Sequence, residues 1–294
     1  MAKTVVGLAV LLGICSGAFA QKYDNRETEN LVKLVNSAAA LVNKEGESAF
    51  EEFREPDSRW FHGDVYIFVW EVNGERVVYP ADIDNEKASL ADLKDLNGKP
   101  IGKWFIDAAD AGGGWVHYYW PLRGGKKAYR WKSAFITSAA SPKSGKKYLV
   151  GCGLYDLRTE RIFLSDTVDA AAALIVRKGT AAFAEIEDRA SRFIFSDVYV
   201  FVIDSTGTEQ VDPLFPEYVG KNIMDLKDTD GHSFVREMFK KASAEKGVWV
   251  KYTWPRPGTE KPSVKMSYIR KVAVSGADYL VGAGVYQPDM GGGK

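Results

Sequence analysis

Apolar side chains recur every three or four residues in two stretches of the chain, and this spacing places them on one face of an α-helix. The positions in the first stretch are Leu31, Leu34, Val35, Ala38, Leu41 and Val42, and those in the second are Val168, Ala171, Ala172, Ile175 and Val176. Each stretch predicts one amphipathic helix whose apolar face packs against a core.

A run of β-branched and aromatic residues follows each predicted helix, at residues 65–70 and 198–203. A run that is apolar on both sides predicts a strand covered on both faces of its sheet. Three more strand-like segments end each half, at residues 115–120, 132–138 and 148–155 and at residues 249–254, 264–274 and 279–286. The connection before them is irregular, with a short helix predicted at residues 233–243. This order favours a mostly antiparallel sheet over parallel βαβ units.

The two halves of the chain repeat one pattern. The sequence Asp-Leu-Lys-Asp at residues 92–95 recurs at residues 225–228, an offset of 133. Similar offsets relate residues 115–121 to 249–255 and residues 148–155 to 279–286. We therefore expect an α+β protein with two domains of one fold, at residues 21–157 and 158–294.

The first twenty residues have the pattern of a cleaved signal peptide. Lys3 precedes an apolar stretch at residues 5–14, and an Ala-Phe-Ala site ends at Ala20. Cleavage after Ala20 predicts a periplasmic or secreted protein. A lipoprotein signal at Cys15 is the alternative, but the bulky Ile14 before it disfavours that processing. Cleavage leaves a single cysteine, Cys152, and no later apolar run long enough to span a bilayer.

Composition excludes several classes of function. The 39 basic and 39 acidic side chains balance, so no cationic excess indicates nucleic-acid binding. The three histidines have no metal-ligand spacing, and the glycines at residues 112–114 lack the Lys-Ser/Thr that would complete a phosphate-binding loop. We predict no cofactor, no metal and no enzymatic activity, because no nucleophile and base can be paired.

The second half contains a long pattern of spaced residues. They are Phe195, Asp197, Tyr199 to Val202, Asp204, Val219 to Asn222, Asp225, Leu226, Asp228, Trp249, Val250, Tyr252, Trp254, Pro255, Pro257, Gly258, Lys265, Ser267, Tyr268, Val281, Gly282 and Gly284 to Tyr286. With this pattern the chain resembles the Cache domains of extracytoplasmic sensors, in a tandem single-Cache type-2 arrangement. The first half departs from the pattern at Glu71, at Arg123-Gly124 and at Phe135, which weakens the expectation that both halves share one ligand chemistry.

The resemblance implies a PAS-like, five-stranded antiparallel sheet behind a long N-terminal helix in each domain. It also implies a small-molecule pocket between the sheet and the irregular crossover. Members of this family often bind short organic acids, amino acids or related metabolites.

Several residues in the strand-like segments are candidates for this pocket. Alternation puts Trp249, Lys251 and Thr253 on one face of a strand and Val250, Tyr252 and Trp254 on the other. The candidate ligand-binding residues are Lys265, Tyr268, Trp249, Tyr252, Lys132, Trp115, His117 and Tyr118. Lys265, repeated as Lys132, would hold a ligand carboxylate, and Tyr268 would donate a hydrogen bond to it. The alternative is an aromatic core with lysines that extend into solvent at a sheet edge.

The sequence as a whole predicts an exported sensory protein that binds a small metabolite, with a carboxylate-like ligand expected. No signalling segment follows Tyr286, so a separate membrane receptor or kinase would be its partner. The alternative is a structural or interaction protein of the envelope whose Cache folds have lost their ligands.

Overall fold

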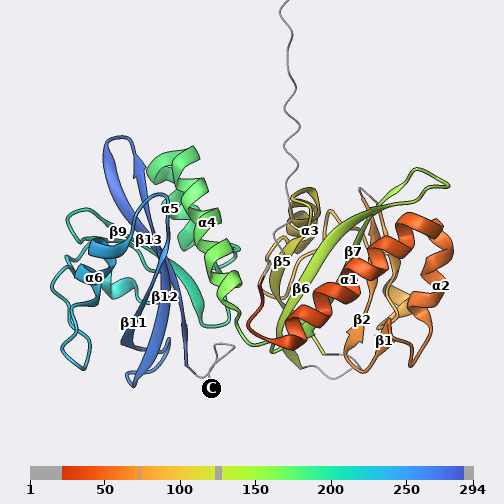
Figure 1. Ribbon diagram of the computed structural model, residues 1–294, viewed down its shortest axis with the longest axis horizontal. Helices are drawn as coiled ribbons and strands as arrows, with labels where there is room; N and C mark the ends of the chain where they lie inside the picture. Colours follow the sequence, from red (N-terminus) through yellow and green to blue (C-terminus); the bar gives the residue numbers. More distant parts are fainter. Residues whose placement is uncertain (1–21, 73, 123–127, 288–294) are drawn as a thin grey trace, which may run out of the picture.

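The computed structural model describes residues 22–287 except residue 73 and residues 123–127. The predicted signal peptide lies outside the described residues. Two domains with the same order of elements follow each other along the chain (Figure 1). The predicted domain boundary, between residues 157 and 158, falls in the connection between them.

The first domain begins with a long helix and ends with three long strands. Its elements are α1 (Arg26–Glu45), α2 (Ala49–Arg54), β1 (Phe61–His62), β2 (Val65–Tyr66), β3 (Phe68–Glu71), β4 (Arg76–Val78), α3 (Ile101–Asp110), β5 (Gly114–Pro121), β6 (Tyr129–Ala140) and β7 (Lys147–Tyr155), with 3-10 turns at Gly46–Ser48 and Ile83–Asn85. The sheet has the antiparallel order β4-β3-β7-β6-β5, and β1 and β2 form a separate pair.

The second domain repeats this topology. Its elements are α4 (Arg161–Lys178), α5 (Ala182–Glu187), β8 (Ile194–Phe195), β9 (Val198–Asp204), β10 (Glu209–Val211), α6 (Phe234–Lys241), β11 (Val248–Pro255), β12 (Pro262–Val274) and β13 (Ala277–Tyr286), with 3-10 turns at Gly179–Ala181 and Pro216–Tyr218. The order β10-β9-β13-β12-β11 matches the first sheet strand for strand, and β8 adds a sixth strand beside β9. The predicted α+β class and antiparallel five-stranded core are confirmed. One strand differs, because the predicted run at residues 65–70 is interrupted at Ile67 between β2 and β3.

Each sheet is covered on both faces, as the apolar runs predicted. The long helix α1 or α4 covers one face, and the crossover with α3 or α6 covers the other (Figure 1). Both long helices end at a glycine with positive φ, Gly46 at 67° and Gly179 at 62°. The backbone N–H of each glycine bonds back to the carbonyl four residues earlier, a C-terminal cap that favours glycine because it has no Cβ.

The two domains are joined by buried polar contacts. The Lys99 side chain of the first domain donates to the carbonyl oxygens of Ser191 and, at 2.8 Å, of Ile194 in the second. The His117 ring stacks on Phe195 with ring centroids 4.0 Å apart. These contacts fix α3 and β5 against the start of the second domain.

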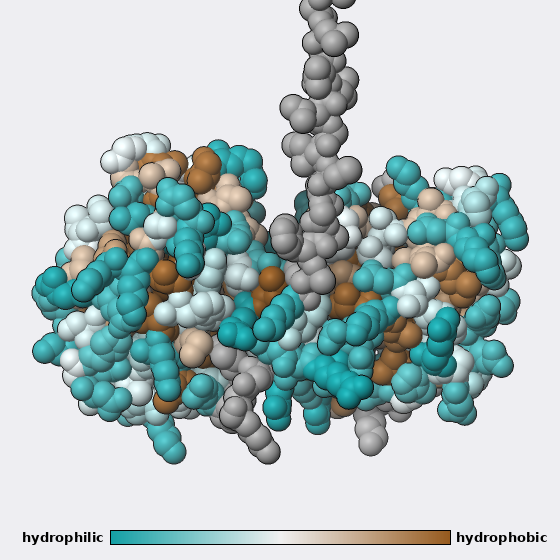
Figure 2. All heavy atoms as spheres, viewed as in Figure 1, coloured by the Kyte–Doolittle hydropathy of each residue, from teal (hydrophilic) through white to brown (hydrophobic). Residues whose placement is uncertain are grey.

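The outer surface is predominantly hydrophilic on the face seen in Figure 2, with separated apolar patches. Among the described residues, no helix is long and apolar enough to cross a lipid bilayer.

Replacing Lys99 with methionine should destabilise the protein by about 1–3 kcal/mol, because two buried carbonyls lose their donor. Urea unfolding monitored by circular dichroism measures this loss. Lys33→Met is the control, since it removes only an exposed ion pair with Glu29 and should cost about 0.5 kcal/mol or less. Equal effects of the two substitutions would contradict the importance of the Lys99 contact.

Candidate ligand-binding site

Each sheet buries one lysine in an equivalent position. Lys132 in β6 and Lys265 in β12 are each only 1% exposed. Lys132 Nζ donates to the Tyr66 hydroxyl at 2.6 Å, and Lys265 Nζ donates to the Tyr199 hydroxyl at 2.8 Å. Each Nζ also lies 4.0 Å from the ring centroid of its tyrosine. The same lysine–tyrosine pair is thus built twice.

The alternative of lysines that extend into solvent from a sheet edge is wrong. Both β6 and β12 have a strand on either side, so neither is an edge strand. The lysine side chains instead lie along the sheet, over a glycine of the neighbouring strand.

Those glycines, Gly153 and Gly284, explain how the lysines fit. A Cβ on Gly153 would lie 2.8 Å from Lys132 Cε, and one on Gly284 would lie 2.5 Å from Lys265 Cε. Both distances are too short for a real contact between carbon atoms. The repeated Gly-x-Gly of β7 and β13 therefore provides a shallow trough for an aliphatic lysine stem.

Burial lowers the pKa of both lysines to about 8, because the charged ammonium is poorly solvated there. Nearby acidic groups act against this lowering of the pKa, and they differ between the two domains. The charges that raise the pKa of Lys265 belong first to Asp212 and then to Glu209, whereas Lys132 is influenced by Cys152 and Asp64. An anion placed beside either lysine would stabilise the charged ammonium and raise its pKa again.

The first cavity lies beside the Lys132–Tyr66 pair and is small, with about 20 Å³ in which the centre of a water molecule can move. Its walls come from β2 to β4, the crossover, α3 and β5. They are Tyr66, Phe68, Trp70, Arg76, Tyr79, Leu93, Ile101, Phe105, Tyr118 and Trp120. Arg76 lies over the Tyr79 ring at 3.6 Å and also faces Trp70. This lining contains one cation and no carboxylate.

The second cavity occupies the same place in the second domain and has the same size. Its walls are Tyr199, Phe201, Ile203, Glu209, Asp212, Ile223, Phe234, Met238, Tyr252, Trp254 and Lys265. Glu209 and Asp212 contribute two buried carboxyl groups to this cavity, whereas the described lining residues of the first cavity include none. Tyr252 exchanges a hydrogen bond of 3.0 Å with Ser267.

The structure brings four of the predicted residues together around these cavities. Tyr118 pairs across strands with Lys132, and Tyr252 pairs with Lys265, so each tyrosine and lysine share the crossover face of their sheet. Val250 and Trp254, which share a strand face with Tyr252, also lie on this side.

The other four predicted residues lie on the opposite faces of the sheets. Trp249 and Tyr268 pack against the cluster around α4, with their ring centroids 5.2 Å apart. Trp115 and His117 lie between the domains, where both contact Phe163 of α4. The structure therefore does not place these four beside the buried lysines.

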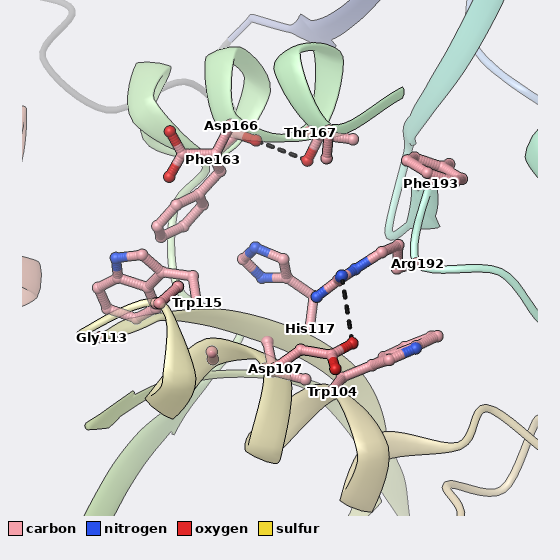
Figure 3. Close-up of a pocket in the computed structure, with 15 residues that line it drawn as sticks. Trp104, Asp107, Gly113, Trp115, His117, Phe163, Asp166, Thr167, Arg192 and Phe193 are labelled. Atoms are coloured by element: carbon pink, nitrogen blue, oxygen red, sulfur yellow. Dashed lines mark hydrogen bonds and ion pairs between the residues drawn. The ribbon is translucent and has the colours of Figure 1, made fainter. Parts of the chain in front are cut away.

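Figure 3 shows the cleft that Trp115 and His117 line between α3, β5 and α4. It offers about 270 Å³ to water-molecule centres, far more than either cavity within a domain. Arg192 spans it toward Asp107 at 3.7 Å. Burial lowers the pKa of His117 to about 3, so this imidazole is neutral at physiological pH, and burial raises the pKa of Asp166 to about 6.

Sequence reasoning missed the partners of the lysines. Tyr66 and Tyr199 stand in the repeated Asp-Val-Tyr segment, which was a usable signal. Arg76, Glu209 and Asp212 gave no such signal, because these positions differ between the halves. The described residues contain no group of three or more His, Cys, Asp or Glu side chains placed to hold a metal ion.

Comparison with known proteins gives matches in both halves. The family model Single Cache domain 2 matches residues 28–155 and 175–291. A segment of 94 residues is 34% identical to the sensor histidine kinase MctS of Rhizobium johnstonii, covering 32% of this chain and 20% of that protein. A segment of 103 residues is 31% identical to the methyl-accepting chemotaxis protein McpP of Pseudomonas putida, covering 35% and 18%.

Among solved structures, a methyl-accepting chemotaxis protein from Vibrio parahaemolyticus RIMD 2210633 is 25% identical, with a TM-score of 0.36. The match covers 43% of this chain and 87% of that one. The aligned segments span about a fifth of the length of the two curated relatives.

The buried ammonium of Lys132 predicts an unusual pH dependence of stability. Its pKa is about 8 in the folded protein and near 10.5 when unfolded, so above pH 8 the unfolded state binds more protons. Raising the pH from 8 to 9.5 should therefore stabilise the wild type by about 1.5 kcal/mol relative to Lys132→Met.

Urea titrations of both proteins at pH 8 and pH 9.5 measure how the free energy of unfolding changes with pH in the wild type relative to Lys132→Met. The ionisation of the tyrosines is common to both proteins and cancels in this comparison. A wild type that gains nothing over Lys132→Met would show that the lysine is not buried as a poorly solvated cation.

Proposed function

The chain belongs to the single Cache domain 2 family, and on this premise we propose that it is an extracytoplasmic sensory protein whose first domain binds a short carboxylate. Cache domains are ligand-binding sensory modules, and the two curated relatives are a sensor kinase and a chemotaxis receptor. We propose three things about this chain, namely the chemical class of its ligand, the kind of partner protein and its cellular location.

The charge of the first cavity is the observation that carries the carboxylate assignment. Arg76 lines this aromatic-walled space, and Lys132 contacts it through the hydroxyl of Tyr66, which is itself a lining residue. Among the described lining residues there is no acidic side chain. Asp82, an exposed residue, is the carboxylate whose charge acts on Arg76. A carboxylate about 4 Å from a poorly solvated ammonium gains about 4 kcal/mol at an intermediate dielectric constant, which favours an anionic ligand.

Size and lining restrict the ligand further. The free space suits a molecule of only a few non-hydrogen atoms, and the rings of Tyr66, Phe105 and Tyr118 surround it. The Tyr66 hydroxyl, already in contact with Lys132, is available as a second polar contact. These features support acids of two or three carbons.

We assign the sensory output to a separate receptor or kinase, because the curated relatives are a sensor histidine kinase and a methyl-accepting chemotaxis protein. The competing role is that of an envelope interaction protein without a ligand. The predicted signal peptide supports the extracytoplasmic location. Subcellular fractionation and N-terminal sequencing of the protein from its native host test that location, and the expected mature N-terminus is Gln21.

Acetate, propionate and pyruvate should raise the melting temperature of the wild-type protein in a thermal-shift experiment. Ligand at 100 times its dissociation constant adds about 2.7 kcal/mol to stability. Lys132→Met should abolish the shift, because it keeps the buried stem and removes the charge.

Lys265→Met is the matched control, since it makes the same change in the second domain and should leave the carboxylate response intact. A carboxylate response that persists in Lys132→Met would exclude the first cavity as its site. No response to any carboxylate, with the protein folded, would favour the envelope interaction role.

A further inference from the structure

The two cavities carry opposite charges at one structural position. Arg76 in β4 pairs with Trp70 in β3, and Glu209 in β10 pairs with Ile203 in β9, which are the equivalent strands of the two sheets. Three residues later along each chain, Tyr79 of the first cavity corresponds to Asp212 of the second. Both halves contain the lysine–tyrosine pair, but the equivalent cavity position is an arginine in the first half and a glutamate in the second.

Glu209 is buried without a hydrogen-bonding partner for one of its oxygens. Its side chain is 3% exposed and lines the second cavity, and Oε1 has no partner within the described structure. A buried acceptor left unpaired costs about 1–3 kcal/mol. A donor on a ligand in the cavity would remove that cost.

Asp212 is not equivalent to Glu209, although both line the cavity. Asp212 Oδ1 accepts the backbone N–H groups of Leu214 at 3.1 Å and Phe215 at 2.8 Å. Its charge is also the strongest acidic influence on Lys265. Asp212 thus serves as the internal counter-charge of the lysine, which leaves Glu209 available to a ligand.

We infer that the second cavity binds a small ligand that carries an ammonium group, with Glu209 as the partner of that group. The inference rests on the proposed ligand-binding function and separates the two domains by the charge of their ligands. The ammonium can belong to a simple amine or to an amino acid. In an amino acid, the carboxylate would face Lys265 and the Tyr199 hydroxyl.

Proton release gives this binding a specific signature. Burial, together with the nearby Asp212, raises the pKa of Glu209 well above its usual range and so favours the protonated carboxyl in the empty site. A bound ammonium stabilises the carboxylate form, and the proton leaves to the buffer. Carboxylate binding beside Lys132 releases no proton at pH 7, because that lysine is already mostly protonated.

Isothermal titration calorimetry at pH 7 tests the inference with methylamine, glycine and acetate as probes, each in two buffers of different ionisation enthalpy. The affinity of the wild type for methylamine and glycine should fall at least tenfold in Glu209→Gln. Their binding enthalpy should depend on the buffer in the sense of proton release. Glu260→Gln, which neutralises an exposed acid of the same domain, is the control and should bind like the wild type.

Lys265→Met distinguishes the two sources of the ammonium group. If glycine binds the wild type more tightly than methylamine and loses that advantage in Lys265→Met, the ligand class is amino acids. Equal affinity of the two probes identifies simple amines.

The inference is overturned if ammonium binding is unchanged in Glu209→Gln, or if the wild type binds no ammonium compound. In that case, acetate binding that depends on Lys132 would still support the proposed function. If acetate binds equally well to Lys132→Met while ammonium binding still depends on Glu209, the proposed carboxylate site in the first domain is overturned and the inference about the second cavity is kept. If Glu209→Gln does not give a cooperative melting transition, Glu209→Leu, which leaves no polar group to bury, takes its place in the same test.

Discussion

Burial of one lysine ammonium beneath a tyrosine ring is the constraint around which each domain is organised. The lysine stem needs a neighbouring strand without side-chain bulk, which Gly153 and Gly284 provide. The ammonium needs a polar partner inside the core, which the hydroxyls of Tyr66 and Tyr199 provide. The desolvation cost of a buried ammonium is only partly offset by a neutral hydroxyl. A ligand anion or a nearby carboxylate can offset the remaining cost.

The two domains resolve that imbalance in different ways. In the second domain Asp212 supplies the main counter-charge of the lysine, whereas in the first domain Arg76 adds further positive charge to the cavity. The lysine position is the same in both domains because the long strands pair in equivalent register, Lys132 opposite Tyr155 and Lys265 opposite Tyr286. The short strands β4 and β10 lie at the sheet edges and border the crossovers, so a substitution there changes the cavity without disturbing the core.

The aromatic contacts of β5 with the second domain lie on the other face of the first sheet from its cavity. His117 and Trp115 face Phe163 of α4, while their strand neighbour Tyr118 faces Lys132. One strand, β5, therefore borders both the first cavity and the interdomain cleft. A shift of β5 on ligand binding would reach the second domain directly through the stacked His117 and Phe195 rings.

The sequence by itself determined the repeated architecture, because the apolar periodicities, the strand runs and the 133-residue offset are local or one-dimensional signals. It also predicted a role for Lys132, Lys265, Tyr118 and Tyr252, which recur in both halves and which the structure places on the crossover faces of the two sheets. Only the tertiary structure decided which face of β5 and β11 borders a cavity, since alternation separates two faces but does not say what covers each. It alone brought Arg76 to the first cavity and Glu209 and Asp212 to Lys265, because strands distant in sequence are joined there by sheet order. The effect of an ionisable residue at such a position depends on its burial and on its neighbours across strands, and the local sequence determines neither.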